Sequence, residues 1–192
     1  MQHSLAARAA FLVRALAAAL VLAGLIAPAP ARSAPPATMP LAPELAPFAW
    51  LAGGAWRADL SALPGGMKLI ETRYDVAPNG VIRFTTAFVR PDGSIANGYA
   101  GALFYDAAAK HLTMWYTDPR GVIVQGPVTL NGEVWSMTFT SDGAVIGKPG
   151  PANFRVDVAR RSNDAYHWTL LADTGGGVWK PVFALDYLRS AA

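Results

Sequence analysis

The 192-residue sequence contains no cysteine. Disulfide bonds, thiolate metal sites and cysteine nucleophiles are therefore excluded. Charged residues make up only 15% of the chain and there are three histidines, so the side chains that usually perform acid–base chemistry or bind metals are few. Long amphipathic helices and internal repeats are also absent from the pattern, which argues against helical bundles and repeat arrays.

The net positive charge of the chain comes entirely from its first 33 residues. The sequence has 16 basic and 13 acidic residues, a formal charge of +3. Arg8, Arg14 and Arg32 lie before residue 33 and all 13 acidic residues lie after it, which leaves 13 − 13 = 0 for the remainder. Binding to nucleic acid or to an anionic membrane surface needs clustered basic residues in excess. We therefore expect neither as a partner.

Residues 1–33 have the pattern of a signal peptide. Arg8 and Arg14 precede an apolar run at residues 15–27, and small residues and prolines follow it. The run is shorter than the roughly 20 residues that span a bilayer, so we expect no membrane span after cleavage. The predicted location is the periplasm or the exterior of a bacterial cell. Residues 34–47 are rich in proline and alanine and are predicted to form an extended tether.

Residues 48–192 are predicted to form one all-β domain, with a short helix before the first strand at residues 43–51. Short runs of β-forming residues alternate with turn sequences, of which Asn131-Gly132 is the strongest hairpin signal. Because nearly all the connections are short, neighbouring strands should pair antiparallel. The predicted strands are 54–60, 68–75, 80–90, 97–106, 110–117, 121–130, 133–141, 153–161, 165–172 and 178–189.

Alternation along these strands places aromatic and aliphatic side chains on one face and mostly polar side chains on the other. In strand 133–141, for example, Trp135 and Phe139 share one parity, while Ser136 and Thr138 share the other. No helices are available to cover so apolar a face, and closing the sheet on itself also removes exposed edges. The pattern therefore predicts an antiparallel up-and-down barrel of about eight to ten strands.

The start of the first strand, Gly54-Ala55-Trp56, matches the G-x-W motif of lipocalins and their calycin relatives. The chain resembles the lipocalin-like domains of secreted bacterial proteins, which similarly contain a central Tyr-Asp turn like Tyr105-Asp106 and end in a pattern like Tyr187-Leu188-Arg189. The resemblance implies that Trp56 closes the bottom of the barrel and that Arg189 packs on its ring as a cation–π partner. The later lipocalin motifs are absent, so the resemblance implies no particular ligand.

An aromatic barrel interior predicts a site for a small hydrophobic or amphipathic ligand, because apolar walls with a few hydroxyl groups are typical of small-molecule pockets. Arg90 lies on the apolar parity of its strand, and at the barrel mouth it would meet a ligand carboxylate. The alternative is that the same rings fill the barrel. The predicted ligand-binding residues are Phe84, Phe88, Arg90, Tyr99, Tyr116, Trp135, Trp168 and Trp179.

Two other functions stay open on the sequence. One is an isomerase, hydratase or cyclase, in which a tyrosine hydroxyl works with Arg90 or Asp106 as acid or base. The other is an envelope interaction module with a filled barrel, for which Trp115, on the polar parity, marks an outer surface. His111 and His167 also lie on the polar parity and lack companions, so we expect no haem, no other cofactor and no metal.

Overall fold

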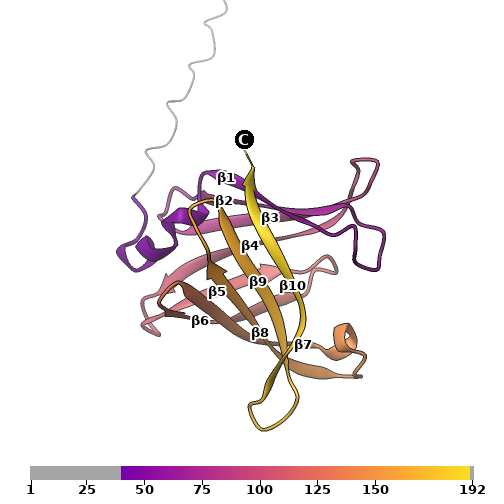
Figure 1. Cartoon of the computed structure of the whole chain (residues 1–192). Helices are drawn as coiled ribbons and strands as arrows, with labels where there is room; N and C mark the ends of the chain where they lie inside the picture. The colour runs from indigo at the N-terminus through magenta and orange to yellow at the C-terminus, as the bar shows by residue number, and fades with distance from the viewer. Residues whose placement is uncertain (1–39, 191–192) are drawn as a thin grey trace, which may run out of the picture. The chain divides into compact units, whose positions relative to one another are not determined.

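The computed structural model describes residues 40–190, and these form a closed antiparallel barrel of ten strands with a short helix before the first (Figure 1). The predicted fold is confirmed, and every predicted strand boundary lies within two residues of an observed one. The signal peptide predicted at residues 1–33 lies outside the described residues. The strands are β1 (Gly54–Asp59), β2 (Leu69–Val76), β3 (Ile82–Val89), β4 (Ile95–Asp106), β5 (His111–Thr117), β6 (Ile123–Asn131), β7 (Val134–Asp142), β8 (Pro151–Arg160), β9 (Ala165–Asp173) and β10 (Trp179–Ser190).

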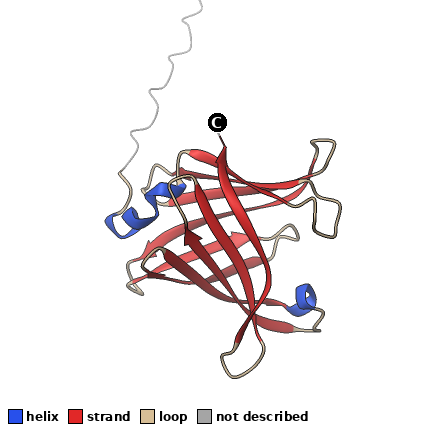
Figure 2. Ribbon diagram, viewed as in Figure 1, coloured by secondary structure: helices blue, strands red, loops and turns tan. Residues whose placement is uncertain are grey.

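Each strand pairs with its neighbour in the sequence, and β1 closes the barrel against β10 (Figure 2). The short turns between strands explain this order, since a two- to five-residue hairpin can only join adjacent antiparallel strands. The loops therefore alternate between the two ends of the barrel. None of the helices within residues 40–190 is long and apolar enough to cross a membrane.

One end of the barrel is closed by the 3-10 helix η1 (Pro43–Leu51). Its Leu45, Phe48 and Leu51 have no exposed surface and pack against the inner ends of the strands. Burying three large apolar side chains of this kind contributes several kcal/mol, at roughly 1.5–3 kcal/mol each. We call this the closed end.

The segment just before η1 is packed on the barrel. The backbone N–H of Ala42 donates a hydrogen bond of 3.1 Å to the carbonyl of Gly80 in the β2–β3 turn. Gly80 has φ +77°, and a Cβ there would lie 2.8 Å from the carbonyl oxygen of Pro40. Glycine is therefore required where this segment crosses the turn. The short helix predicted at residues 43–51 is confirmed as η1.

A β-bulge in β10 turns Trp179 to the outer face of the barrel, opposite to the face predicted for it. The pairing of β10 with β9 shifts register between Pro181 and Phe183. Phe183 is opposite Leu170 on the inner face, whereas Trp179 is opposite Asp173, three residues further along β9, and therefore faces outward. The prediction from alternation assumed an unbroken strand. One extra residue at the bulge reverses the face of the strand residues that precede it.

Candidate functional site

The barrel contains a cavity of about 960 Å³. It extends to the end of the barrel opposite η1, where its walls include residues of the β1–β2, β5–β6 and β7–β8 connections. We call this end the mouth. Arg120 and Asp142 lie there, and their side chains are about half exposed. The interior is therefore not filled by its own side chains, and the volume suits one ligand of ordinary drug size.

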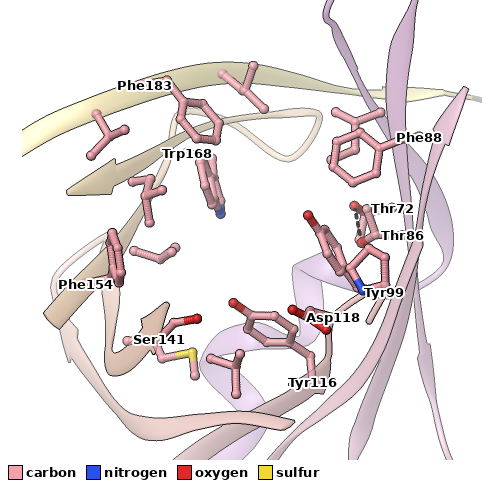
Figure 3. A pocket seen from close by; sticks show the side chains of 18 of the residues that line it. Thr72, Thr86, Phe88, Tyr99, Tyr116, Asp118, Ser141, Phe154, Trp168 and Phe183 are labelled. Carbon is pink, nitrogen blue, oxygen red and sulfur yellow. Dashed lines mark hydrogen bonds between the residues drawn. The ribbon is translucent and has the colours of Figure 1, made fainter. Parts of the chain in front are cut away.

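Tyr116 on β5 is the centre of an aromatic wall on one side of the cavity (Figure 3). Its ring centroid lies 6.5 Å from that of Phe84, 5.7 Å from Tyr99 and 6.3 Å from Phe139. The rings meet edge to face or tilted, which are the favourable arrangements for aromatic pairs. Gly101 leaves the room for this packing, because a Cβ there would lie 2.7 Å from the Cβ of Tyr116. The wall is thus built by the packing itself and does not need a ligand to hold it.

Trp168 and Phe183, from β9 and β10, form the aromatic pair across the cavity, with ring centroids 5.2 Å apart (Figure 3). The ring nitrogen of Trp168 points into the cavity (Figure 3). A flat ligand placed in the cavity would therefore have aromatic surface on both sides.

The structure brings six of the eight predicted ligand-binding residues together along this cavity. They are Phe84, Phe88, Tyr99, Tyr116, Trp135 and Trp168. Trp179 lies outside because of the bulge in β10, and the guanidinium carbon of Arg155 sits 5.2 Å from the centroid of its ring. Arg90 is also outside the lining, because its guanidinium donates to Ser94 Oγ and to the carbonyl of Ile95 within its own hairpin.

Several polar groups on the cavity wall have no partner. Among the described residues, no hydrogen bond engages the hydroxyl of Tyr99, Tyr116 or Ser141, or the side-chain amide of Asn97. Burial raises the pKa of Tyr99 and of Tyr116, with the negative charge of Asp118 adding to the effect in both. Both hydroxyls are therefore protonated near neutral pH and offer a proton to whatever enters.

Other hydroxyls of the cavity are paired with one another. The hydroxyls of Thr72 and Thr86 are 2.9 Å apart on neighbouring strands (Figure 3). Burial raises the pKa of Tyr74 to about 12, an effect that a hydrogen bond with Tyr166 reduces in part. Burial also raises the pKa of Tyr187, which bonds to Thr72. These groups satisfy each other, so they stabilise the wall and compete less for a ligand.

Three charged side chains meet at the mouth. The guanidinium of Arg120 donates to Asp118 Oδ2 from Nε at 2.9 Å and from Nη2 at 2.7 Å, and to Asp142 Oδ2 from Nη1 at 3.2 Å. Burial works to raise the pKa of Asp118, but its hydrogen bonds with Arg120 and Val122 outweigh that and hold it below the usual value. The hydrogen bond from the backbone N–H of Ala144 lowers the pKa of Asp142, and the hydrogen bond from Arg120 lowers it further. Both carboxylates are thus ionised at neutral pH.

Sequence reasoning missed the polar members of this cavity. Thr86 lies between Phe84 and Phe88 on one parity, so the alternation alone would have placed it inside. Asn97 shares the parity of Tyr99 and pairs in regular register with Phe88, so the alternation would have placed it inside as well. Asp118 and Arg120 were interpreted only as turn residues, and nothing in the local sequence shows that Asp142 lies within reach of them.

The contact predicted between Trp56 and Arg189 is present at the closed end. The guanidinium carbon of Arg189 lies 4.2 Å from the centroid of the Trp56 ring. Arg189 also donates to the carbonyls of Ala52 and Trp50. Trp56 Nε1 donates to the carbonyl of Leu51 at 2.8 Å, which ties η1 to the barrel.

The residues proposed for other chemistry lie away from the cavity. His167 is on the outer face, where its Nδ1 is 2.6 Å from Asp186, and His111 begins β5 at the surface. Asp106 accepts the backbone N–H of Ala108 and so holds the β4–β5 turn. Within residues 40–190 no group of three or more acidic or histidine side chains is placed to hold a metal ion. Trp115 is on the outer face of β5, about one-third exposed.

No protein-family model matches the chain, and no curated protein matches it in sequence. Its fold is similar to that in the crystal structure of Rv2717c from M. tuberculosis, with a TM-score of 0.50. The two chains are 16% identical, and the match covers 78% of this chain and 99% of that one. At this identity the similarity concerns the fold alone.

Proposed function

We propose that this protein binds a small hydrophobic or amphipathic molecule inside the barrel, in the manner of a lipocalin-like carrier. The observation that carries the proposal is the cavity of about 960 Å³, which is walled by aromatic rings and extends to the mouth. An interior built only for stability would be close-packed, since each void forfeits contacts that stabilise the fold. An apolar wall with several unpaired hydroxyls is instead the usual composition of a ligand site.

The proposal includes a location outside the cytoplasm, in the periplasm or in the medium. Its support is the signal-peptide pattern of residues 1–33. A carrier of poorly soluble molecules is useful in such an aqueous compartment. Fractionation of cells that express the full chain, with N-terminal sequencing of the product, tests this part separately.

The binding proposal is tested with an uncharged fluorescent probe, N-phenyl-1-naphthylamine, titrated into the purified protein. We expect saturable enhancement of its emission with a stoichiometry of one and a dissociation constant in the micromolar range. Ser141→Trp places a large ring in the cavity and should weaken binding at least tenfold.

Thr138→Trp is the matched control, because Thr138 is on the same strand but on its exposed outer face. It should bind the probe like the wild type. Two results would contradict the proposal. One is the absence of saturable binding, and the other is equal binding by wild type, Ser141→Trp and Thr138→Trp, which would locate the probe on the outer surface.

A further inference from the structure

We infer that the cavity selects uncharged ligands that accept hydrogen bonds, such as aromatic amides and ketones, over carboxylates of the same shape. This inference rests on the proposed function and specifies its ligand class. It follows from which charges line the cavity and how they are already engaged.

The charged side chains that line the cavity add up to a negative charge. They are Asp118, Arg120 and Asp142, so the sum is −2 + 1 = −1. A ligand carboxylate that enters this mouth therefore meets a net repulsion. Moving it further into the aromatic interior costs still more, because a buried charge without a partner loses its hydration.

Arg120 is the only described residue of the lining that carries a positive charge, and two carboxylates already neutralise it. All three of its guanidinium nitrogens donate to carboxylate oxygens, two of these bonds going to Asp118 and one to Asp142, which uses three of its five N–H donors. A ligand carboxylate that displaced one aspartate would leave that aspartate without its counter-charge. One that bound only the remaining N–H donors would share a single positive charge with two carboxylates, so neither arrangement gains much.

The polar groups that remain for a ligand include three donors. Figure 3 shows the hydroxyls of Tyr99 and Tyr116 on one side of the cavity and the ring nitrogen of Trp168 on the other. An indole nitrogen can only donate, and a protonated tyrosine hydroxyl donates to any carbonyl within reach. A neutral carbonyl oxygen held between aromatic walls satisfies these donors without bringing a charge into the interior.

The experiment compares three ligands that share one ring system, 2-naphthamide, 2-naphthoate and 2-methylnaphthalene, by calorimetric titration of the wild-type protein at pH 7. The amide and the carboxylate have nearly the same shape and differ in charge. We expect the amide to bind at least tenfold more tightly than the carboxylate. Equal affinity, or tighter binding of 2-naphthoate, would overturn the inference.

The double variant Asp118→Asn, Asp142→Asn tests the reason for the selection. Asparagine keeps the Oδ1 atoms that accept the backbone N–H groups of Arg120 and Ala144, so the loops should keep their shape. It also frees Arg120 and changes the local charge from −1 to +1. We expect the affinity for 2-naphthoate to rise at least fivefold while that for 2-naphthamide changes less than twofold. An unchanged affinity for the carboxylate would contradict the role given to the two aspartates.

The double variant Tyr99→Phe, Tyr116→Phe tests the hydroxyl donors while keeping both rings. The affinity for 2-naphthamide should fall about fivefold for each bond lost, and that for 2-methylnaphthalene should not change. The three ligands together also separate the two levels of the proposal. If none of them binds, the proposed function fails. If they bind but amide and carboxylate bind alike, only the selection fails.

Discussion

The two ends of this barrel use the same kinds of side chain for opposite purposes. At the closed end Trp56, Phe48 and Leu51 are fully buried, and the polar atoms of Trp56 and Arg189 are bonded to backbone carbonyls. Toward the mouth, Tyr99 and Tyr116 are equally aromatic, but their hydroxyls have no partner among the described residues. Aromatic content alone therefore does not separate a core from a binding site. The separation lies mainly in whether the polar atoms attached to the rings are satisfied. Trp135 is the exception, because its ring packs on Phe48 while its buried Nε1 has no partner among the described residues.

The largest expected effect is at the closed end. Trp56→Ala removes a fully buried ring and its hydrogen bond to η1, and should lower the free energy of unfolding by about 3–5 kcal/mol. Trp168→Ala, at the half-buried wall of the open cavity, should cost less than half as much because its site is already partly empty. Urea unfolding of both variants makes the comparison. Equal losses would mean that the two ends do not differ in packing.

Arg189 is predicted to be the second most sensitive position. Arg189→Met keeps much of the side-chain volume but removes the cation–π contact with Trp56 and the bonds to the carbonyls of Trp50 and Ala52. We expect a loss of about 1–3 kcal/mol by chemical denaturation. The control is Arg155→Met, which removes the cation–π contact with Trp179 and the ion pair with Asp157 on the outer face and should cost about 1 kcal/mol or less. A loss in Arg155→Met as large as in Arg189→Met would contradict the structural role given to Arg189.

The paired hydroxyls inside the cavity give a smaller effect. Thr72→Val leaves Thr86 and Tyr187 without their partner and should cost about 1 kcal/mol. The double variant Thr72→Val, Thr86→Val removes both ends of one bond and should recover part of that loss. Thermal unfolding of the two variants decides the matter. A double variant less stable than Thr72→Val would show that these hydroxyls hold the wall by something other than their mutual bond.

The smallest expected effect is the acid dependence of the mouth. Hydrogen bonds hold the pKa values of Asp118 and Asp142 below the usual value of an aspartate, so the folded state binds protons less readily there than the unfolded chain does. Their contribution to stability is therefore complete above the unfolded pKa, near pH 4, and is lost as the pH falls through the lower folded values. The Asp118→Asn, Asp142→Asn variant should accordingly show a shallower loss of stability below about pH 4 than the wild type. Parallel curves would contradict the pairing of Arg120 with both carboxylates.

The sequence predicted the fold well because the barrel depends on repeated local signals. Turn residues such as Asn131-Gly132 separate the strands, and the two-residue alternation is repeated from strand to strand. An error at a single position therefore leaves the predicted fold unchanged. The errors fall where one residue breaks the repetition. The bulge near Val182 reversed the face of Trp179.

The cavity depended on information that no single segment contains. Whether inner rings fill a barrel or leave space is set by how ten strands curve around each other, and the alternation is the same in both cases. The charges at the mouth are a similar case, because Arg120 and Asp142 come from different loops and meet only in the closed barrel. Individual wall residues such as Phe84 and Trp135 could be predicted from the sequence. The cavity that the wall residues enclose could not.

The most direct test is a crystal structure of the protein with N-phenyl-1-naphthylamine bound. We predict electron density for one probe molecule inside the barrel, between the Tyr99–Tyr116 wall and the Trp168–Phe183 pair, with η1 in place at the closed end. A barrel whose rings have closed on one another, with the probe bound on the outer surface or not at all, would contradict the proposal that the cavity is a binding site.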